Sequence, residues 1–309
     1  MKLEGIHHIT AITENGQKNV DFYVGVLGLR MVKKTVNQDN PTAYHLFYAD
    51  EKGDPGSDLT FFEYPGIPQG RPGSGMVHRI VWRIGSTEAL DFWQGRLTSR
   101  GVKVDRVDGH LRFPDPEGLE HELLVPDVDD EPLTADHPEI PAEMALQGFD
   151  GVRAYTDEPG RSRELLDGAL GFNPREGDRL WEARGDVRGS LYEYDETPEG
   201  RGLQAAGSVH HVAWASTPED HEIWRDRVIS AGAQPTPVID RFYFRSIYFR
   251  EPSGVLFEIA TIGPGFTIDE PLEALGEKLS LPPFLEHMRE QIEPGLRPIT
   301  NPRHVPASG

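Results

Sequence analysis

The amino-acid sequence contains an internal fourfold repeat, and this repeat constrains the fold more than any other feature. In each copy a strand-like opening is followed by a helix-like stretch and then by three further strand-like stretches. The third copy is fainter than the others. We number the copies as modules one to four, and they open with GIHHITAIT (5–13), MVHRIVWRI (76–84), GFDGVRAYT (148–156) and GSVHHVAWA (207–215).

One βαβββ module is too small to bury both faces of its short sheet, so the modules are expected to pair. The sequence therefore predicts an α+β fold in which four βαβββ modules pair into two open, curved, mixed β-sheets, each enclosing a cavity. A segment rich in proline and aspartate (127–144) predicts a division into an N-terminal half (1–130) and a C-terminal half (145–265). The tail (266–309) is expected to pack on the body, with a short helix near 282–292.

The composition narrows the range of partners. The chain has 309 residues with 31 Lys and Arg against 51 Asp and Glu, which gives a formal net charge of −20. Nucleic acid and anionic membranes are therefore disfavoured, because their phosphates would be repelled. No apolar run approaches the roughly 18 residues of a membrane span, so a cytoplasmic protein is expected. Because the chain has no cysteine, a transition metal would need His, Asp and Glu ligands.

Lysine is scarce, since only seven of the 31 basic residues are lysines. Scarce lysine and a large acid excess are typical of proteins from halophilic organisms, where salt screens the acidic surface. An acidic protein from a GC-rich genome would have the same composition. Both interpretations stay open at this point, and a homo-oligomer is compatible with either.

Five motifs, in their order along the chain, resemble the vicinal oxygen chelate superfamily, and within it the two-domain, four-module ring-cleaving dioxygenases. The resemblance spans residues 4–285, and its motifs are GIHHIT, YHLFYADEKGDPGSDLTFF, GSVHHVAWA, REPSGVLFEIAT and GPGFTIDEPLEALGEKLSLPP. It implies a metal-dependent, extradiol-type dioxygenase that opens a hydroquinone- or catechol-like ring with O2. The expected partners are thus a small aromatic substrate and O2, and the expected cofactor is Fe(II), with Mn(II) as the alternative.

Candidate metal ligands follow from aligning the four modules with one another. The second histidine of each HH pair, His8 in module one and His211 in module four, falls at the same place in the repeat, where modules two and three have Arg79 and Gly151. Strand alternation favours His211 over its neighbour, because His211 shares its face with two small alanines. In module one the alternation does not decide between the two histidines. The resemblance selects His8.

A third ligand is expected in the last strand of module four. Glu258 lies within the apolar stretch VLFEIA and has a counterpart, Glu122, in module two. The resemblance implies that His8, His211 and Glu258 hold the metal, and two histidines with one carboxylate leave open positions for reactants. Modules one and four must then face each other, and modules two and three would form a structural pair without metal.

The remaining candidates surround these ligands. His7 and His210 could carry protons beside the metal or could simply pack behind the sheet. Tyr248 and Arg241 match residues that the resemblance places at the pocket, where they would hydrogen-bond an oxygen and offset the charge of a phenolate. Thr10 lies on the His8 face and is expected to line the substrate pocket.

A competing ligand is Asp58, because its distance in sequence from His8 is close to that of Glu258 from His211. As a fourth ligand it would favour a glyoxalase-like isomerase, whereas the turn-like sequence DPGSDLT favours a local role. A second alternative is a non-catalytic protein of the same fold that binds an aromatic compound or an antibiotic.

Overall fold

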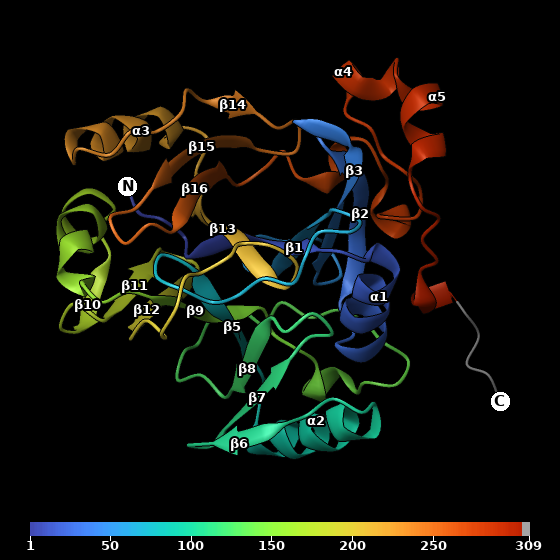
Figure 1. Ribbon diagram of the computed structural model, residues 1–309, viewed down its shortest axis with the longest axis horizontal. Helices are drawn as coiled ribbons and strands as arrows, with labels where there is room; N and C mark the ends of the chain where they lie inside the picture. Colours follow the sequence, from blue (N-terminus) through green and yellow to red (C-terminus); the bar gives the residue numbers. More distant parts are fainter. Residues whose placement is uncertain (305–309) are drawn as a thin grey trace.

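The computed structural model describes residues 1–304 and contains two eight-stranded mixed sheets with few helices (Figure 1). The first sheet joins module four to module one, and its strand order is β14 (Ile239–Asp240), β15 (Arg245–Arg250), β16 (Leu256–Thr261), β13 (Ser208–Ser216), β1 (Ile6–Thr13), β4 (Asp58–Glu63), β3 (Asn40–Ala49) and β2 (Arg30–Asn37). The predicted α+β fold of paired modules is confirmed. Modules one and four do share a sheet.

The second sheet joins module three to module two in the same manner. Its order is β10 (Asn173–Glu176), β11 (Leu180–Arg184), β12 (Gly189–Asp195), β9 (Phe149–Tyr155), β5 (Val77–Arg83), β8 (Glu120–Leu124), β7 (His110–Pro114) and β6 (Asp105–Val107). The segment 127–144 connects β8 to β9 within this one sheet. Whether the two halves of the chain fold as separate units stays a prediction.

Each module has its helix after its first strand. Modules two and four have the regular helices α2 (Thr87–Ser99) and α3 (His221–Ser230), whereas modules one and three combine short turns with π-helix, namely α1 (Gly16–Val20) with η1 (Asp21–Val26) and η3 (Pro159–Ser162) with η4 (Glu164–Ala169). The wider turn appears in the bonds from the Leu27 amide to the Phe22 carbonyl and from the Leu170 amide to the Leu165 carbonyl, both 2.9 Å.

The centre of the first sheet positions the candidate site. β1 and β13 pair antiparallel, and each is flanked by a parallel strand of its own module, β4 beside β1 and β16 beside β13. All eight residues of β1 are buried. Ile9 and Ala11 belong to the main hydrophobic core, and His8 belongs to the wall of a cavity on the opposite face. β1 is therefore buried on both faces, with apolar side chains toward the core and His8 toward the cavity.

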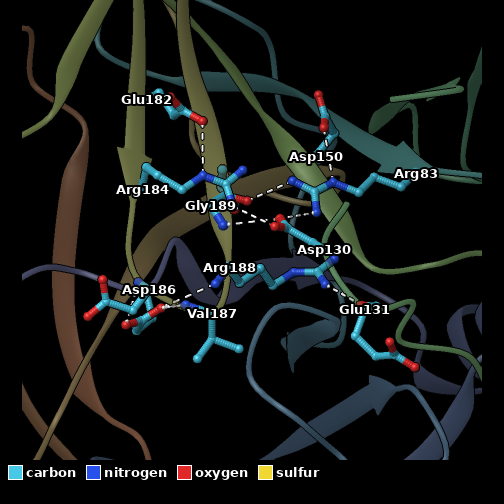
Figure 2. Close-up of polar contacts among 12 residues, drawn as sticks. Arg83, Asp130, Glu131, Asp150, Glu182, Arg184, Asp186, Val187, Arg188 and Gly189 are labelled. Atoms are coloured by element: carbon cyan, nitrogen blue, oxygen red, sulfur yellow. Dashed lines mark hydrogen bonds and ion pairs between the residues drawn. The ribbon is translucent and has the colours of Figure 1, made fainter. Parts of the chain in front are cut away.

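Charged residues of the second sheet line a pocket of their own, among them Arg83, Asp150 and Arg184. Arg83 of β5 donates to Asp150 at 3.0 Å and to Asp130 at 2.7 Å, and Arg184 of β11 forms a second ion pair with Asp130 (Figure 2). Asp130 belongs to the segment between the sheet's two halves. These ion pairs hold that segment against β5 and β11.

The C-terminal tail packs along β2, at the outer edge of the first sheet (Figure 1). The Ser280 amide donates to the Lys34 carbonyl at 2.9 Å, and the fully buried ammonium of Lys33 forms ion pairs with Asp269 and Glu270. The helix predicted near 282–292 is present as two short helices. The tail elements are η5 (Phe266–Ile268), η6 (Leu272–Ala274), α4 (Pro283–Glu286), α5 (Arg289–Ile292), η7 (Glu293–Gly295) and η8 (Pro302–His304), and η2 (Ala142–Met144) precedes β9.

Membrane insertion through a helix has no support in the structure. Among residues 1–304, no helix has both the length and the apolar character needed to cross a bilayer. The expected cytoplasmic location, the absence of nucleic-acid partners and the halophilic source stay predictions.

Candidate metal centre

Three neighbouring strands bring the predicted ligands together. His8 comes from β1, His211 from β13 and Glu258 from β16, and in the strand registers both His8 and Glu258 are paired with Ala213. Because paired residues of adjacent strands share a face, all three side chains point into the concave side of the first sheet. The three candidate ligands thus come together from module one and module four, which lie at opposite ends of the sequence.

The ligand atoms converge closely. The Glu258 Oε2 atom lies 2.9 Å from His211 Nε2 and 3.3 Å from His8 Nε2, and the two imidazole nitrogens are 3.3 Å apart. His8 and His211 are buried, and Glu258 is completely so. Within residues 1–304, no other group of three or more His, Asp or Glu side chains brings ligand atoms this close together.

The residues present fit a metal ion. Within residues 1–304, the Glu258 carboxylate has no polar partner other than the ligand nitrogens of His8 and His211, although an unsatisfied buried carboxylate is costly. A buried carboxylate that faces two imidazole nitrogens is the donor set of a divalent transition metal.

His7 orients the His8 ring. The His7 Nε2–H donates to the Thr261 carbonyl at 3.2 Å, so His7 Nδ1 accepts from His8 Nδ1–H at 3.0 Å. The lone pair of His8 then lies on Nε2, which is the atom that faces Glu258. Burial lowers the pKa of His7 to about 3, so the ring is neutral as this arrangement requires.

His210 stands in the same relation to His211. The two Nδ1 atoms are 2.8 Å apart, and a proton on His211 Nδ1 leaves its Nε2 free for a metal. Burial lowers the pKa of His210 to about 3. Of the two roles left open for His7 and His210, contact with the ligand histidines therefore has geometric support. A role in proton transfer stays a prediction.

A cavity of about 450 Å³, including its open mouth, lies above His8 and His211. Its walls combine aromatic rings with a few polar groups, which is typical of small-molecule sites. The lining residues are His8, Thr35, Asn37, Gln38, Asp39, His45, Phe47, Phe62, His211, Arg241, Tyr243, Phe244 and Tyr248.

Tyr248 and Arg241 line this cavity together. The Arg241 Nε–H donates to the Tyr248 hydroxyl oxygen at 3.3 Å, and the Arg241 guanidinium also forms a bidentate pair with Asp39 at 2.9 and 3.1 Å. Burial raises the pKa of Tyr248, so the phenol keeps its proton near neutrality. The Tyr248 hydroxyl therefore accepts from Arg241 and can donate into the cavity.

Thr10 is placed beneath the cavity surface. Its side chain is fully buried, and its hydroxyl is hydrogen-bonded to the Thr60 hydroxyl at 2.8 Å. Thr60 in turn contacts His45 Nε2 at 2.8 Å, and His45 does line the cavity. The predicted role of Thr10 in substrate binding would thus act through two other residues.

Asp58 is not in the position equivalent to Glu258. Glu258 pairs with Ala213, two residues after His211, whereas Asp58 pairs with His8 itself. The residue equivalent to Glu258 in module one is Thr60, which pairs with Thr10. Counting residues along the chain missed this offset of two, because the loop lengths of the two modules differ.

The second sheet has the same positions with other residues. Arg79 stands where module one has His8, and it donates to Glu122 at 3.2 Å. Arg112 and His110 also contact the Glu122 carboxylate, at 2.8 and 2.6 Å. Side-chain donors thus satisfy the carboxylate that is equivalent to Glu258.

Sequence reasoning missed His45, Phe47, Phe62 and Phe244 as cavity residues. One signal was present, because His45 and Phe47 alternate along YHLFYAD and thus share a face. Nothing in the sequence indicates that this face closes over the metal ligands. That placement depends on the curl of the sheet.

The fold agrees with comparisons to known proteins. A family model described as "Glyoxalase/Bleomycin resistance protein/Dioxygenase superfamily" matches residues 5–123 and 148–259, and the chain belongs to this superfamily. Among its relatives is the Bacillus subtilis protein named "Putative ring-cleaving dioxygenase MhqO", with 43% identity over 96% of this chain and 97% of the relative. The chlorohydroquinone/hydroquinone 1,2-dioxygenase of Sphingobium indicum is 32% identical over 97% of both chains.

Solved structures give the same picture. A crystal structure of a "putative dioxygenase" from Bacillus subtilis superposes with a TM-score of 0.90 at 41% identity, covering 97% of this chain and 98% of the other. Glyoxalase I from Zea mays has a TM-score of 0.57 at 15% identity, covering 89% of this chain and 97% of the other. The second likeness concerns the fold alone.

Proposed function

We propose that the protein is a metal-dependent, extradiol-type ring-cleaving dioxygenase that acts with O2 on a hydroquinone- or catechol-like aromatic. The observation that carries this proposal is the convergence of His8, His211 and Glu258 at the base of an aromatic-walled cavity. The names of the relatives support the same reaction class. Fe(II) is the metal we expect, with Mn(II) as the alternative, because both accept two imidazoles and one carboxylate.

The metal would supply a site where a phenolate and O2 are activated side by side. The protein's own residues have separate tasks. His7 and His210 hold the ligand rings with Nε2 toward the metal position. The Tyr248 hydroxyl, which Arg241 contacts, is positioned to donate to a substrate oxygen, and the Arg241 charge favours a bound phenolate.

The proposed reaction is tested with anaerobically purified protein reloaded separately with Fe(II), Mn(II), Zn(II) or Ni(II). We expect oxygen uptake with Fe(II) or Mn(II) on hydroquinone, chlorohydroquinone or catechol, with one O2 consumed per ring opened. Isomerisation of a hemithioacetal without O2 would instead establish the glyoxalase alternative. Tight binding of an aromatic compound, with no turnover in the presence of any of these metals, would instead support the non-catalytic alternative.

Replacement of Asp58 by Asn tests the three-ligand set. Thr60 occupies the position of the missing fourth ligand, so we expect metal content and oxygen uptake to be unchanged in Asp58→Asn. A four-ligand site would lose metal on this change. Metal content of the dialysed protein, measured by mass spectrometry, decides between the two.

The same variant should change the pH dependence of stability. Burial, with Asp50 nearby, raises the pKa of Asp58 well above its usual value, and within residues 1–304 neither carboxyl oxygen has a hydrogen-bond partner. The folded state then holds the proton more tightly than the unfolded state, so wild-type stability falls as pH rises above about 4. Asp58→Asn should lack this loss and gain relative stability with rising pH in urea unfolding. A difference in the free energy of unfolding between Asp58→Asn and the wild type that stays constant across pH would contradict this prediction.

A further inference from the structure

We propose that His45 is a substrate-binding and specificity-determining residue, which holds the ring oxygen that lies farthest from the metal ligands. This inference rests on the proposed function, and it adds a contact that selects aromatics with two oxygens at opposite ends of the ring. It is carried by the position of His45 in the cavity, by its fixed orientation and by the one ring nitrogen that it leaves free.

The first observation is the place of His45 in the cavity wall. In the first sheet β3 lies two strands from β1, beyond β4, and β15 lies two strands from β13, beyond β16. Two strand spacings are about 10 Å, so these two strands lie on opposite sides of the strands that carry the ligands. His45 and Tyr248 therefore line the same cavity from opposite sides of the metal position.

The second observation is that the imidazole plane is fixed. The His45 ring contacts the rings of Phe47 and Phe62, with centroids 4.0 and 4.3 Å away and the planes tilted by 40° and 43°. Its Nε2 atom is hydrogen-bonded to the Thr60 hydroxyl at 2.8 Å. A ring held by two aromatic contacts and one hydrogen bond has little rotational freedom, and this preorganisation favours binding.

The third observation concerns the other nitrogen. Within residues 1–304, Nδ1 of His45 has no hydrogen-bond partner, while the ring lines the cavity. An unpaired polar atom beside Phe47 and Phe62 selects ligands that can satisfy it, because leaving it unpaired in a complex costs affinity. The ligand group it selects is therefore a hydroxyl or a carbonyl oxygen.

The Thr10–Thr60 pair lets His45 bind either group. When Thr10 donates to Thr60 and Thr60 donates to Nε2, the ring proton lies on Nδ1 and can be donated to a carbonyl oxygen. When the hydrogen bonds run in the opposite direction, Nε2–H donates to the Thr60 hydroxyl, Thr60 donates to Thr10, and Nδ1 accepts from a substrate hydroxyl. Both directions satisfy the hydrogen-bonding groups of all three residues. Thr60, which stands at the repeat position of Glu258, thus helps to orient the substrate-binding group His45.

The substrate class follows from where the second oxygen must lie. The adjacent oxygens of a catechol can both reach one metal ion, so a catechol leaves no oxygen for His45. In a hydroquinone the second oxygen lies at the far end of the ring. The geometry of the cavity therefore favours hydroquinones over catechols and over monophenols.

The test uses full-length protein reloaded with Fe(II), and it measures binding of hydroquinone and of 4-methylphenol by calorimetry without O2. In His45→Leu we expect hydroquinone binding to weaken about tenfold, the equivalent of one hydrogen bond, while 4-methylphenol binding changes less than about twofold. His45→Gln should recover part of the loss, since its amide can reach a hydroxyl. His137→Leu, in the segment before β9, is the control.

A second variant guards against a purely structural effect. Thr60→Val keeps the shape and the imidazole but removes the partner of Nε2, so it should reduce the selectivity for hydroquinone over 4-methylphenol by about threefold. Equal losses for both ligands in His45→Leu, or no loss for either, would overturn the inference. So would a failure of the wild-type protein to bind hydroquinone.

These outcomes are separate from those of the proposed reaction. Hydroquinone binding that depends on His45 in a protein that never consumes O2 would overturn ring cleavage and leave the His45 contact in place. Oxygen uptake that is equally fast in His45→Leu, with unchanged KM for hydroquinone, would overturn the His45 contact and leave ring cleavage in place.

Discussion

Glu258→Gln is expected to abolish tight metal binding while the protein stays folded. The change removes the only negative charge among the three proposed ligands and keeps the shape of the side chain. Because loss of a residue that merely supports a ligand costs 10- to 100-fold in affinity, loss of the ligand itself should cost more than about 100-fold. Metal content after dialysis and competition with a chromogenic chelator measure this loss. Oxygen uptake should disappear with it.

The expected effect on stability is small. The polar neighbours of the Glu258 carboxylate in the described chain are Nε2 of His211 and of His8, at 2.9 and 3.3 Å, and a neutral amide in its place can still donate to these nitrogens. His8→Ala and His211→Ala should also lose the metal, because each removes one of the two imidazoles. A Glu258→Gln protein that retains full metal content after dialysis would show that the site lies elsewhere.

The matched control is Glu122→Gln in the second sheet, at the equivalent place in the repeat. Here we expect the opposite pattern, with unchanged metal content and a stability lower by about 3 kcal/mol, because Arg79, Arg112 and His110 lose a buried anionic partner. Urea unfolding measures the stability. Loss of metal in Glu122→Gln would contradict the assignment of the site to modules one and four.

Lys33→Met is expected to destabilise the protein by about 3 kcal/mol and to release the tail from the first sheet. The Lys33 side chain is completely buried, and its ammonium forms ion pairs with Asp269, at 2.7 Å, and with Glu270. Methionine fills a similar volume but leaves two largely buried carboxylates without their cation. Urea unfolding measures the stability, and limited proteolysis of residues 262–283 measures the release.

The neighbouring Lys34 provides the control, because the contact of its ammonium with the Glu277 carbonyl is exposed to solvent. Lys34→Met should change stability by less than about 0.5 kcal/mol. Neutralising the partners in Lys33→Met/Asp269→Asn/Glu270→Gln should restore part of the loss. Equal stability of the Lys33 and Lys34 variants would show that the buried ion pairs do not hold the tail.

Release of the tail should also affect the cavity. The Tyr243 hydroxyl, on the cavity wall, donates to Asp269 at 3.0 Å, and Asp269 also accepts from Ser280 at 2.7 Å. The same carboxylate thus anchors the tail and one wall residue. In Lys33→Met we therefore expect weaker hydroquinone binding together with the loss of stability, while metal content is retained.

Much of the fold was predictable from the sequence, because its signals are local. The alternation of apolar residues and the recurring order of strands and helix identify four modules, and modules of this size must pair to bury their sheets. The ligand candidates were predictable for the same reason. Repetition of the HH pair in modules one and four distinguished His8 and His211 from single histidines, which occur in many strands for other reasons.

Two parts of the candidate site were not predictable from the sequence. The role of position 60 depends on strand register, since a shift of two residues keeps the same face and leaves the alternation unchanged while moving the side chain by about 7 Å along the strand. His45 and its contacts with Thr60 depend on the curl of the sheet, which brings strands from opposite sides of the ligands around one cavity. Neither the strand register nor the curvature of the sheet can be read from the pattern of apolar residues in one segment.

The sequence by itself thus determined the four modules and the repeated HH pairs, because periodicity and repetition are properties of short segments, while the choice of His8, His211 and Glu258 as ligands also used the family resemblance. The tertiary structure decided that Thr60 rather than Asp58 is equivalent to Glu258, that His45 faces the cavity, and that Lys33 holds the tail. Each of these depends on contacts between residues far apart in the chain, such as Lys33 with Asp269. Such contacts are set by register and packing across the whole sheet, and no single segment contains that information.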